Sequence, residues 1–193
     1  MYEAIHGKLK EITPAYAIID TGAFSYYLHI SLNCFTQIQN KETVDLFLHH
    51  VIREDAQLLY GFFSNDERQV FRQLISVSGV GANTARMILS SMTSGEIKTA
   101  IVSGNVEVLK GIKGIGAKSA QRIIVDLRDK IAIDEEKSEL LLTADNTNKI
   151  EALSALETLG FNKKSAEKVV NSIVMKEPEL SVEEVIKKSL KQL

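Results

Sequence analysis

The chain contains the stretch Ser78-Gly79-Val80-Gly81-Ala82-Asn83-Thr84-Ala85 and, thirty-five residues later, Lys113-Gly114-Ile115-Gly116-Ala117-Lys118-Ser119-Ala120. In both copies a Gly-apolar-Gly segment leads into a helical pattern, and the same alanines and a later isoleucine, Ile88 or Ile123, follow. One such segment would be an ordinary connection between helices. Two matching copies indicate a repeated structural unit.

The repeated glycines predict a binding site for phosphate groups. Glycine lets the backbone approach a ligand closely, and the first N–H groups of a helix have no partner within the helix. Those N–H groups and the helix dipole favour negative charge, so two such turns side by side suit successive phosphates of a nucleic acid. We expect sequence-independent DNA binding through the turn glycines and the peptide N–H groups beside them, namely Gly79, Val80, Gly81, Gly114, Ile115 and Gly116.

Charged side chains near the second copy strengthen the same prediction. Lys118 and Arg122 lie at the start of the second helical pattern and one turn into it, where a cation can reach a phosphate; the alternative is a solvated helix face. The first copy has Asn83 at the position of Lys118, which predicts a hydrogen bond in place of an ion pair. Arg86 is a candidate to compensate for the missing charge.

Other phosphate-binding motifs do not fit these residues. A dinucleotide-binding fold requires G-x-G-x-x-G after a strand, and an ATP-binding P-loop ends in Gly-Lys-Ser/Thr. Here Gly116 is followed by Ala117 and Lys118, after a segment of helical pattern. We therefore expect no cofactor and no catalytic site, and any ATP-driven work must come from a partner.

The charge of the chain is unevenly distributed. The 193 residues carry a net charge of −2. Residues 64–133 contain ten basic and six acidic residues, a net of +4, whereas 1–63 and 134–193 each carry −3. Both glycine turns lie in the basic segment, so the acidic total does not exclude salt-sensitive DNA binding.

Composition limits the remaining classes of protein. At 45% hydrophobic residues, the chain can bury a sizeable core. The single cysteine, Cys34, excludes an intramolecular disulfide and fits a reducing cytoplasm. We see no signal peptide or membrane span. The histidines show no metal-ligand spacing, so no metal site is expected.

Sequence patterns divide the chain into four segments: 1–63, 64–133, a polar linker over 134–148, and 149–193. Runs rich in Ile, Val, Leu, Tyr and Phe predict five short strands and a small barrel in the first segment, including 15–20, 25–31, 44–52 and 56–63. The second is helical throughout. Ser64 with Glu67 has the pattern of a capping box, and Ser94 is a further candidate cap.

The last segment predicts a three-helix module. Leucines at helical spacing end at Gly160, a typical helix stop, and Ser181 with Glu184 is a second capping-box pattern. The polar residues of 134–148 predict a flexible tether for this module. The apolar triplet 140–142 interrupts them and fits an extension of the preceding helix or a transient contact better than a binding motif.

The two glycine segments resemble the tandem helix-hairpin-helix motifs of DNA-binding proteins. The segment Arg53-Glu54-Asp55-Ala56-Gln57-Leu58-Leu59-Tyr60-Gly61-Phe62 resembles the end of the N-terminal domain of the RuvA family. The resemblance covers residues 1–133 with strong motifs and 149–193 with weaker ones. It implies a multidomain α+β fold: an N-terminal OB-fold β-barrel, a central all-α tandem helix-hairpin-helix domain and a C-terminal three-helix, UBA-like module.

The same resemblance implies partners and further site residues. It implies recognition of four-way (Holliday) junctions, with Glu54 and Asp55 as an acidic pin at the junction centre. It implies a RuvB motor that contacts the C-terminal module, where the candidate residues are Leu156, Leu159, Gly160 and Phe161. It further implies a homotetramer or a two-tetramer octamer, and a RuvC resolvase as another partner.

Two other classes of protein remain open at this point. Some DNA glycosylases combine a helix-hairpin-helix with a nucleophilic lysine where Lys118 lies, but they also need a pocket for a flipped base. No second helical lobe remains in the sequence to form one. A protein-interaction adaptor would explain the acidic outer segments and the C-terminal module, but would leave the two glycine turns without a role.

Overall fold

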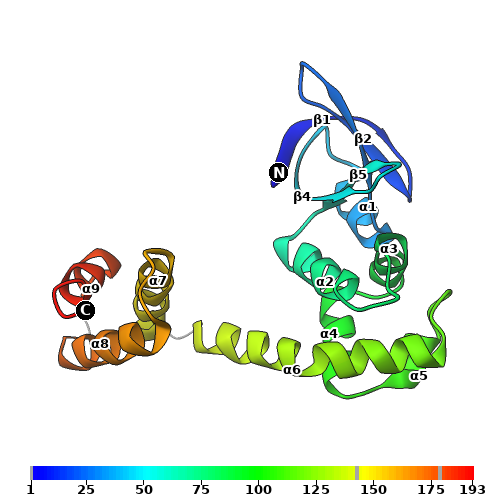
Figure 1. Ribbon diagram of the computed structural model, residues 1–193. Helices are drawn as coiled ribbons and strands as arrows, with labels where there is room; N and C mark the ends of the chain where they lie inside the picture. The colour runs from blue at the N-terminus through cyan, green and yellow to red at the C-terminus, as the bar shows by residue number, and fades with distance from the viewer. Residues whose placement is uncertain (1, 142–143, 178–179) are drawn as a thin grey trace. The chain divides into compact units, whose positions relative to one another are not determined.

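The computed structural model describes residues 2–141, 144–177 and 180–193. The chain forms two compact units, residues 1–131 and residues 132–193, which are described separately. The first unit contains a β-barrel followed by helices, and the second is helical (Figure 1). Within the described ranges, no helix combines the length and apolar character needed to traverse a bilayer.

Five strands close into a barrel in the order β1-β2-β3-β5-β4: β1 (Ala4–Ile12), β2 (Tyr16–Asp20), β3 (Ser25–His29), β4 (Thr43–Ile52) and β5 (Gln57–Phe62). β3 and β5 pair in parallel, and the other neighbouring strands pair antiparallel. Buried residues alternate along β2 because successive side chains point to opposite faces. Ile19, Leu28 and Leu46 fill the interior. The OB-like barrel is confirmed.

Two elements of the barrel unit were not singled out by sequence patterns. β1 is nine residues long but contains Gly7, Lys8 and Lys10, which dilute its apolar alternation. The helix α1 (Leu32–Ile38) follows β3 and is capped by Ser31, whose hydroxyl accepts a hydrogen bond from the N–H of Cys34 at 2.9 Å. It occupies part of the interval between β3 and β4.

The central domain is helical, as predicted. It comprises α2 (Asn65–Ile75), α3 (Ala82–Ser91), α4 (Ser94–Val102), α5 (Val106–Lys110) and the first part of α6 (Ala117–Leu141). The cap of α4 is Thr93 rather than Ser94, and it forms a full capping box with Glu96. Ser64 caps α2 as expected, but the Glu67 carboxylate accepts a hydrogen bond from Ser31 instead of completing the predicted box.

The barrel and the central helices share one hydrophobic core. Tyr60 and Phe62 of β5 lie 5.0 and 4.9 Å, centroid to centroid, from the ring of Phe71 on α2. The same cluster continues through Val80 and Ile115 beside the two glycine turns. The barrel and both turns therefore belong to a single packed body.

Most of the predicted linker is helical. α6 extends through residues 134–141, and α7 (Ala144–Thr158) already includes residues 144–148. Glu, Lys and Leu are strong helix formers, which explains why a polar composition did not end the helix. The segment 134–148, predicted as a polar, flexible linker, is thus helical over 134–141 and 144–148, and residues 142–143 lie outside the described residues. The mobility of the tether stays a prediction.

The second unit contains α7, α8 (Lys163–Lys176) and α9 (Val182–Ser189). Its small core includes Ala152, Leu156, Ala166, Val170 and Val185. Gly160 follows α7 with φ +93°, as the glycine stop predicts. Ser181 and Glu184 form the predicted capping box at α9.

Candidate nucleic-acid interface

The two glycine segments have nearly the same backbone geometry. Gly79 and Gly114 have φ of +90° and +91°, a region that favours glycine. The N–H of Val80 donates to the carbonyl of Val77, and the N–H of Ile115 to that of Ile112, both at 3.0 Å. A positive φ at the third residue of a hydrogen-bonded four-residue turn is the geometry of a type II turn. The repeat is therefore structural as well as sequential.

This geometry corrects one part of the predicted site. The N–H groups of Val80 and Ile115 bond within the turns, so they are not the phosphate donors that we expected. Their side chains are also buried, in the core that continues to the barrel. Val80 and Ile115 hold the turns in place, and the exposed donors must lie further along the chain.

Gly81 and Gly116 occupy the entrances to the following helices. Each accepts the first helical hydrogen bond at 2.9 Å, Gly81 from the N–H of Ala85 and Gly116 from that of Ala120. Gly81 caps α3 without any side-chain hydrogen bond, which leaves the first N–H groups of that helix without the usual capping acceptor. Both glycines are exposed.

The interior of the protein does not require glycine at these two positions. A Cβ atom added to Gly81 or Gly116 would meet no heavy atom within 4 Å, and neither residue has a positive φ. A side chain would point into open space. Glycine here keeps the approach to the helix entrance clear for a ligand.

The cationic side chains near the second turn are more exposed than Arg86, the cationic side chain near the first turn. Lys118 is exposed in the first turn of α6, and Arg122 is exposed with its Nε 3.9 Å from Asp126. Arg86 instead donates to the carbonyl of Ile30 at 3.2 Å and to Oδ1 of Asn83 at 3.0 Å. Arg86 therefore orients Asn83 and joins α3 to Ile30, which lies between β3 and α1. The sequence analysis did not predict this role.

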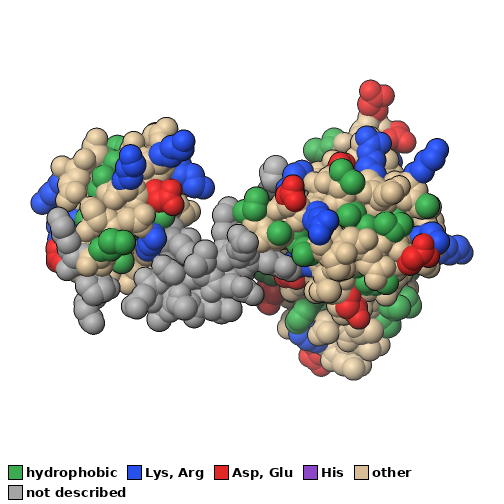
Figure 2. All heavy atoms as spheres, turned by 90° about the horizontal axis from the view of Figure 1, so that it is seen from below, with side chains coloured by type: hydrophobic (Ala, Val, Ile, Leu, Met, Phe, Trp, Pro, Cys, Tyr) green, Lys and Arg blue, Asp and Glu red, His purple; other side chains and the backbone are tan. Residues whose placement is uncertain are grey.

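Charged side chains are dispersed over one face of the barrel-containing unit (Figure 2). In Figure 2, Lys and Arg side chains on the visible face of the barrel-containing unit are interspersed with Asp and Glu and do not form one continuous patch. A nucleic acid on such a surface would depend on oriented N–H groups and a few placed cations. This matches the geometry of the two turns.

The two acidic candidates lie together at the tip of a hairpin. Arg53 donates its N–H to the carbonyl of Ala56 at 2.8 Å, closing the turn between β4 and β5. Glu54 and Asp55 are the central residues of this turn, and both are exposed. Among the described residues, neither carboxylate has an ion-pair partner. The hairpin therefore presents two exposed carboxylates that form no ion pair within the described part of the chain, next to the Arg53 cation.

The candidates for partner contact separate into two groups. Leu156 is fully buried in the core of its own unit, which corrects its expected role as a direct contact. Phe161 packs against the same core and is half-buried. Leu159 is 61% exposed, and Met175, which sequence reasoning did not select, is 85% exposed. No sequence pattern marks Met175, and the exposure of its apolar side chain in the structure is what identifies it as a candidate contact.

Titratable groups elsewhere include two histidines and the single cysteine. No three potential ligands converge on a metal site in the part of the chain that the structure describes. Burial lowers the pKa of His29 and His49, and burial raises the pKa of the Cys34 thiol. These groups are neutral at pH 7.

The OB-like barrel, the paired glycine turns and the separate helical module define a multidomain protein of the tandem helix-hairpin-helix class. Three family profiles match the chain: the RuvA N terminal domain over residues 1–61, the SAM-like helix-hairpin-helix tandem over 71–129, and the RuvA C-terminal domain over 150–193. The chain belongs to the RuvA family.

Similar proteins align with this chain from end to end. The chain is 47% identical to proteins from Christiangramia forsetii and Flavobacterium psychrophilum and 45% identical to one from Bacteroides thetaiotaomicron. Each alignment covers 100% of both sequences. All three relatives are named "Holliday junction branch migration complex subunit RuvA".

Proposed function

We propose that this protein is a non-catalytic DNA-binding subunit that recognises four-way junctions. The observation that carries the proposal is the pair of exposed glycines, Gly81 and Gly116, each at a helix entrance and each surrounded by open space. Phosphates fit these entrances because the helix dipole and the N–H groups favour an anion. Lys118 and Arg122 add salt-dependent attraction beside the second turn.

The acidic hairpin supplies preference for a branch point. Glu54 and Asp55 repel phosphate, so an intact duplex running across the hairpin tip is disfavoured. At the centre of a junction the strands separate, and the two charges can occupy the gap between them. The turns thus provide affinity for DNA, and the hairpin provides selectivity for a junction over a duplex. One packed body carries both features.

Partners complete the proposed activity. The relatives are named as subunits of a branch migration complex, and no ATP-binding loop is present in the sequence. We therefore assign ATP hydrolysis to a RuvB motor, contacted through the C-terminal unit, and no cofactor to this chain. A homotetramer would match four duplex arms and multiply weak contacts. An octamer of two tetramers, contact with RuvC and a cytoplasmic location belong to the same proposal.

The test compares a synthetic four-way junction with linear duplex of equal base-pair content across a salt series. We expect tighter binding to the junction and weaker binding as salt rises. Equal affinity for both DNAs would reduce the protein to a general helix-hairpin-helix binder. Absence of binding at low salt would favour an adaptor, and a borohydride-trapped adduct on abasic DNA would favour a glycosylase.

A pair of matched variants tests the hairpin separately. Glu54→Gln with Asp55→Asn removes two charges after the end of β4 and should strengthen duplex binding relative to junction binding. Glu42→Gln with Asp45→Asn makes the same chemical change at the opposite end of β4 and should leave the ratio unchanged. Equal behaviour of the two variants would remove the acidic hairpin from the proposal.

A further inference from the structure

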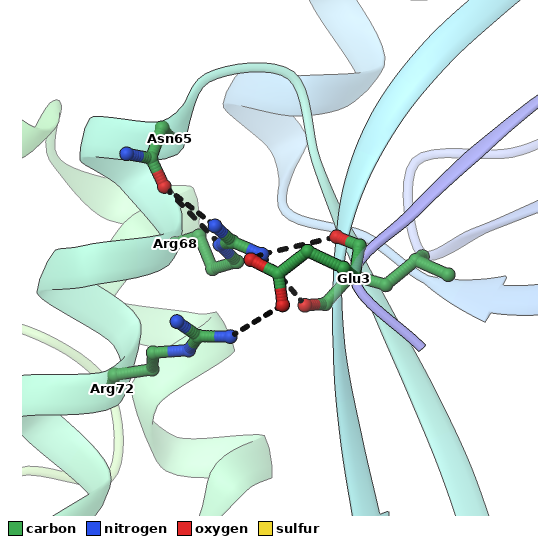
Figure 3. Close-up of polar contacts among 5 residues, drawn as sticks. Glu3, Asn65, Arg68 and Arg72 are labelled. Carbon is green, nitrogen blue, oxygen red and sulfur yellow. Dashed lines mark hydrogen bonds and ion pairs between the residues drawn. The ribbon is translucent and has the colours of Figure 1, made fainter. Parts of the chain in front are cut away.

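A buried arginine joins the barrel to the central helices. Arg68 on α2 is 5% exposed. Its Nη1 donates to the carbonyls of Glu3 at 3.0 Å and Leu48 at 3.4 Å and lies 2.5 Å from the Glu3 carboxylate. Its Nη2 donates to Oδ1 of Asn65 at 2.8 Å, as Figure 3 shows. We call Arg68, Glu3, Asn65 and Leu48 the Arg68 clamp.

The clamp accepts one orientation of the guanidinium. The planar guanidinium meets acceptors on Glu3, just before β1, on Leu48 of β4 and on Asn65 of α2 at once, and a lysine ammonium cannot reproduce that set. Arg68 also lies over the Phe47 ring, 5.0 Å from its centroid. The hydrogen bond from Arg68 holds the pKa of Glu3 below its usual value, so this carboxylate is charged at neutral pH.

A separate set of contacts joins the unit at α1 and α3. The side-chain amide of Asn33 donates to the carbonyls of Leu89 at 2.6 Å and Met92 at 2.9 Å. Arg86 donates to the carbonyl of Ile30. These two polar attachments add to the hydrophobic packing of β4 and β5 against α2 and fix the angle of the barrel on the central helices. With the clamp loosened, the hydrophobic contacts remain, and β4 can change its direction on them.

A change in the direction of β4 at the clamp would displace the acidic hairpin. Leu48 lies on β4, and Glu54 follows it by six residues, beyond the end of the same strand. At about 3.3 Å per residue the tip lies roughly 20 Å along the chain from Leu48, so a change of about 10° in the direction of the strand at Leu48 moves the tip by about 3 Å. The two glycine turns lie on the helical side of the clamp and would not follow that movement.

We propose that Arg68 is a positioning residue for junction selectivity, because it fixes the place of the Glu54–Asp55 hairpin tip relative to the two glycine turns. The inference rests on the proposed function. Loss of the clamp leaves both turns intact, so duplex affinity is retained while the preference for a junction falls.

The experiment uses two lysine variants of the full chain on the same helix. Arg68→Lys retains the charge but loses the clamp geometry. Arg72→Lys is the matched control, because Arg72 also contacts the Glu3 carboxylate, at 3.6 Å, but is partly exposed. Both are measured well below their unfolding midpoints. We expect the junction-to-duplex affinity ratio to fall about threefold or more in Arg68→Lys and to stay at the wild-type value in Arg72→Lys.

Glu3→Gln supplies a milder second variant in case Arg68→Lys does not fold, and its ratio should fall less in the same direction. A second readout needs no DNA. Spin labels on Arg53→Cys and Ser78→Cys report the distance between the hairpin and the first turn, since Cys34 is buried. The distance distribution should broaden in Arg68→Lys and not in Arg72→Lys.

The outcomes separate the two proposals. A junction-selective wild type with an unchanged affinity ratio in folded Arg68→Lys and Glu3→Gln refutes the positioning role alone, whatever the distances show. A wild type without junction preference refutes the proposed function, and the positioning role with it. A lower ratio together with a broadened distance supports the inference.

Discussion

Two glycines in the first turn are expected to separate stability from binding. Gly79→Ala and Gly81→Ala add the same methyl group two positions apart. Gly79 has φ +90°, where alanine is strained, whereas Gly81 has φ −82° and ψ 165°, which any residue adopts. Neither added Cβ would meet a heavy atom within 4 Å. The backbone alone therefore distinguishes the effects of the two substitutions on folding.

The magnitudes follow from that difference. A non-glycine residue in the left-handed region costs about 1–2 kcal/mol, which for a unit of this size lowers the unfolding midpoint by about 4–7 °C. Gly81→Ala removes only freedom of the unfolded chain, so its midpoint should stay level or rise by about 1–3 °C. Gly81→Ala should nevertheless weaken junction binding about tenfold, because its methyl group occupies the space through which a phosphate approaches the helix.

Circular dichroism melts and fluorescence anisotropy with labelled junction DNA measure both effects. Gly95→Ala is the control for Gly81→Ala, since Gly95 is also exposed, has open space around it and lies on α4, outside the first turn. It should bind as the wild type does. Wild-type affinity in Gly81→Ala would mean that DNA does not approach this helix entrance, and an unchanged melt in Gly79→Ala would contradict the turn geometry.

Three other changes have defined outcomes. Lys118→Gln should lower the slope of log affinity against log salt by about 0.9 for each subunit that contacts DNA, the value for one phosphate contact per subunit, and an unchanged slope would place Lys118 on a solvated face. Burial raises the pKa of Glu67 above its ordinary value of 4.5. The folded state therefore holds that proton more tightly than the unfolded state, and the resulting stabilisation is complete below pH 4.5 and is lost as pH rises through the folded pKa. Glu67→Gln should remove that loss, so denaturant titrations at pH 4 and pH 7 should differ less than in the wild type. Leu156→Ala should destabilise the C-terminal unit by about 2–5 kcal/mol, whereas Leu159→Ala should leave its melt unchanged and weaken only RuvB binding; equal melts for the two variants would contradict the assigned burial.

Much of the fold could be predicted from the sequence because periodicity and capping act locally. The Gly160 stop and the Ser181–Glu184 capping box each lie within one short segment, and both are confirmed. The Ser64–Glu67 box failed for the opposite reason. Ser31, thirty-three residues before Ser64, donates to the Glu67 carboxylate, and no local pattern contains that partner.

In the candidate site, too, features set by local sequence could be predicted and features set by tertiary contacts could not. Turns at Gly79 and Gly114 were predicted from the motif, and the structure has turns there, with a positive φ at both glycines. The motif did not show that the N–H groups of Val80 and Ile115 close the turns. Arg86 resembled a phosphate contact in sequence, but its acceptor on Ile30 is brought near only by tertiary packing.

Main-chain contact at the helix entrances has a consequence for motion. A phosphate is the same chemical group at every nucleotide, so a grip made by peptide N–H groups at Gly81 and Gly116 would give successive positions along the DNA nearly equal energy. Few base-specific contacts would have to be broken as the DNA advances by one step. On the proposed function, a motor partner would then move DNA between positions of nearly equal free energy. Little of the free energy of each motor cycle would be needed to break contacts that favour one position.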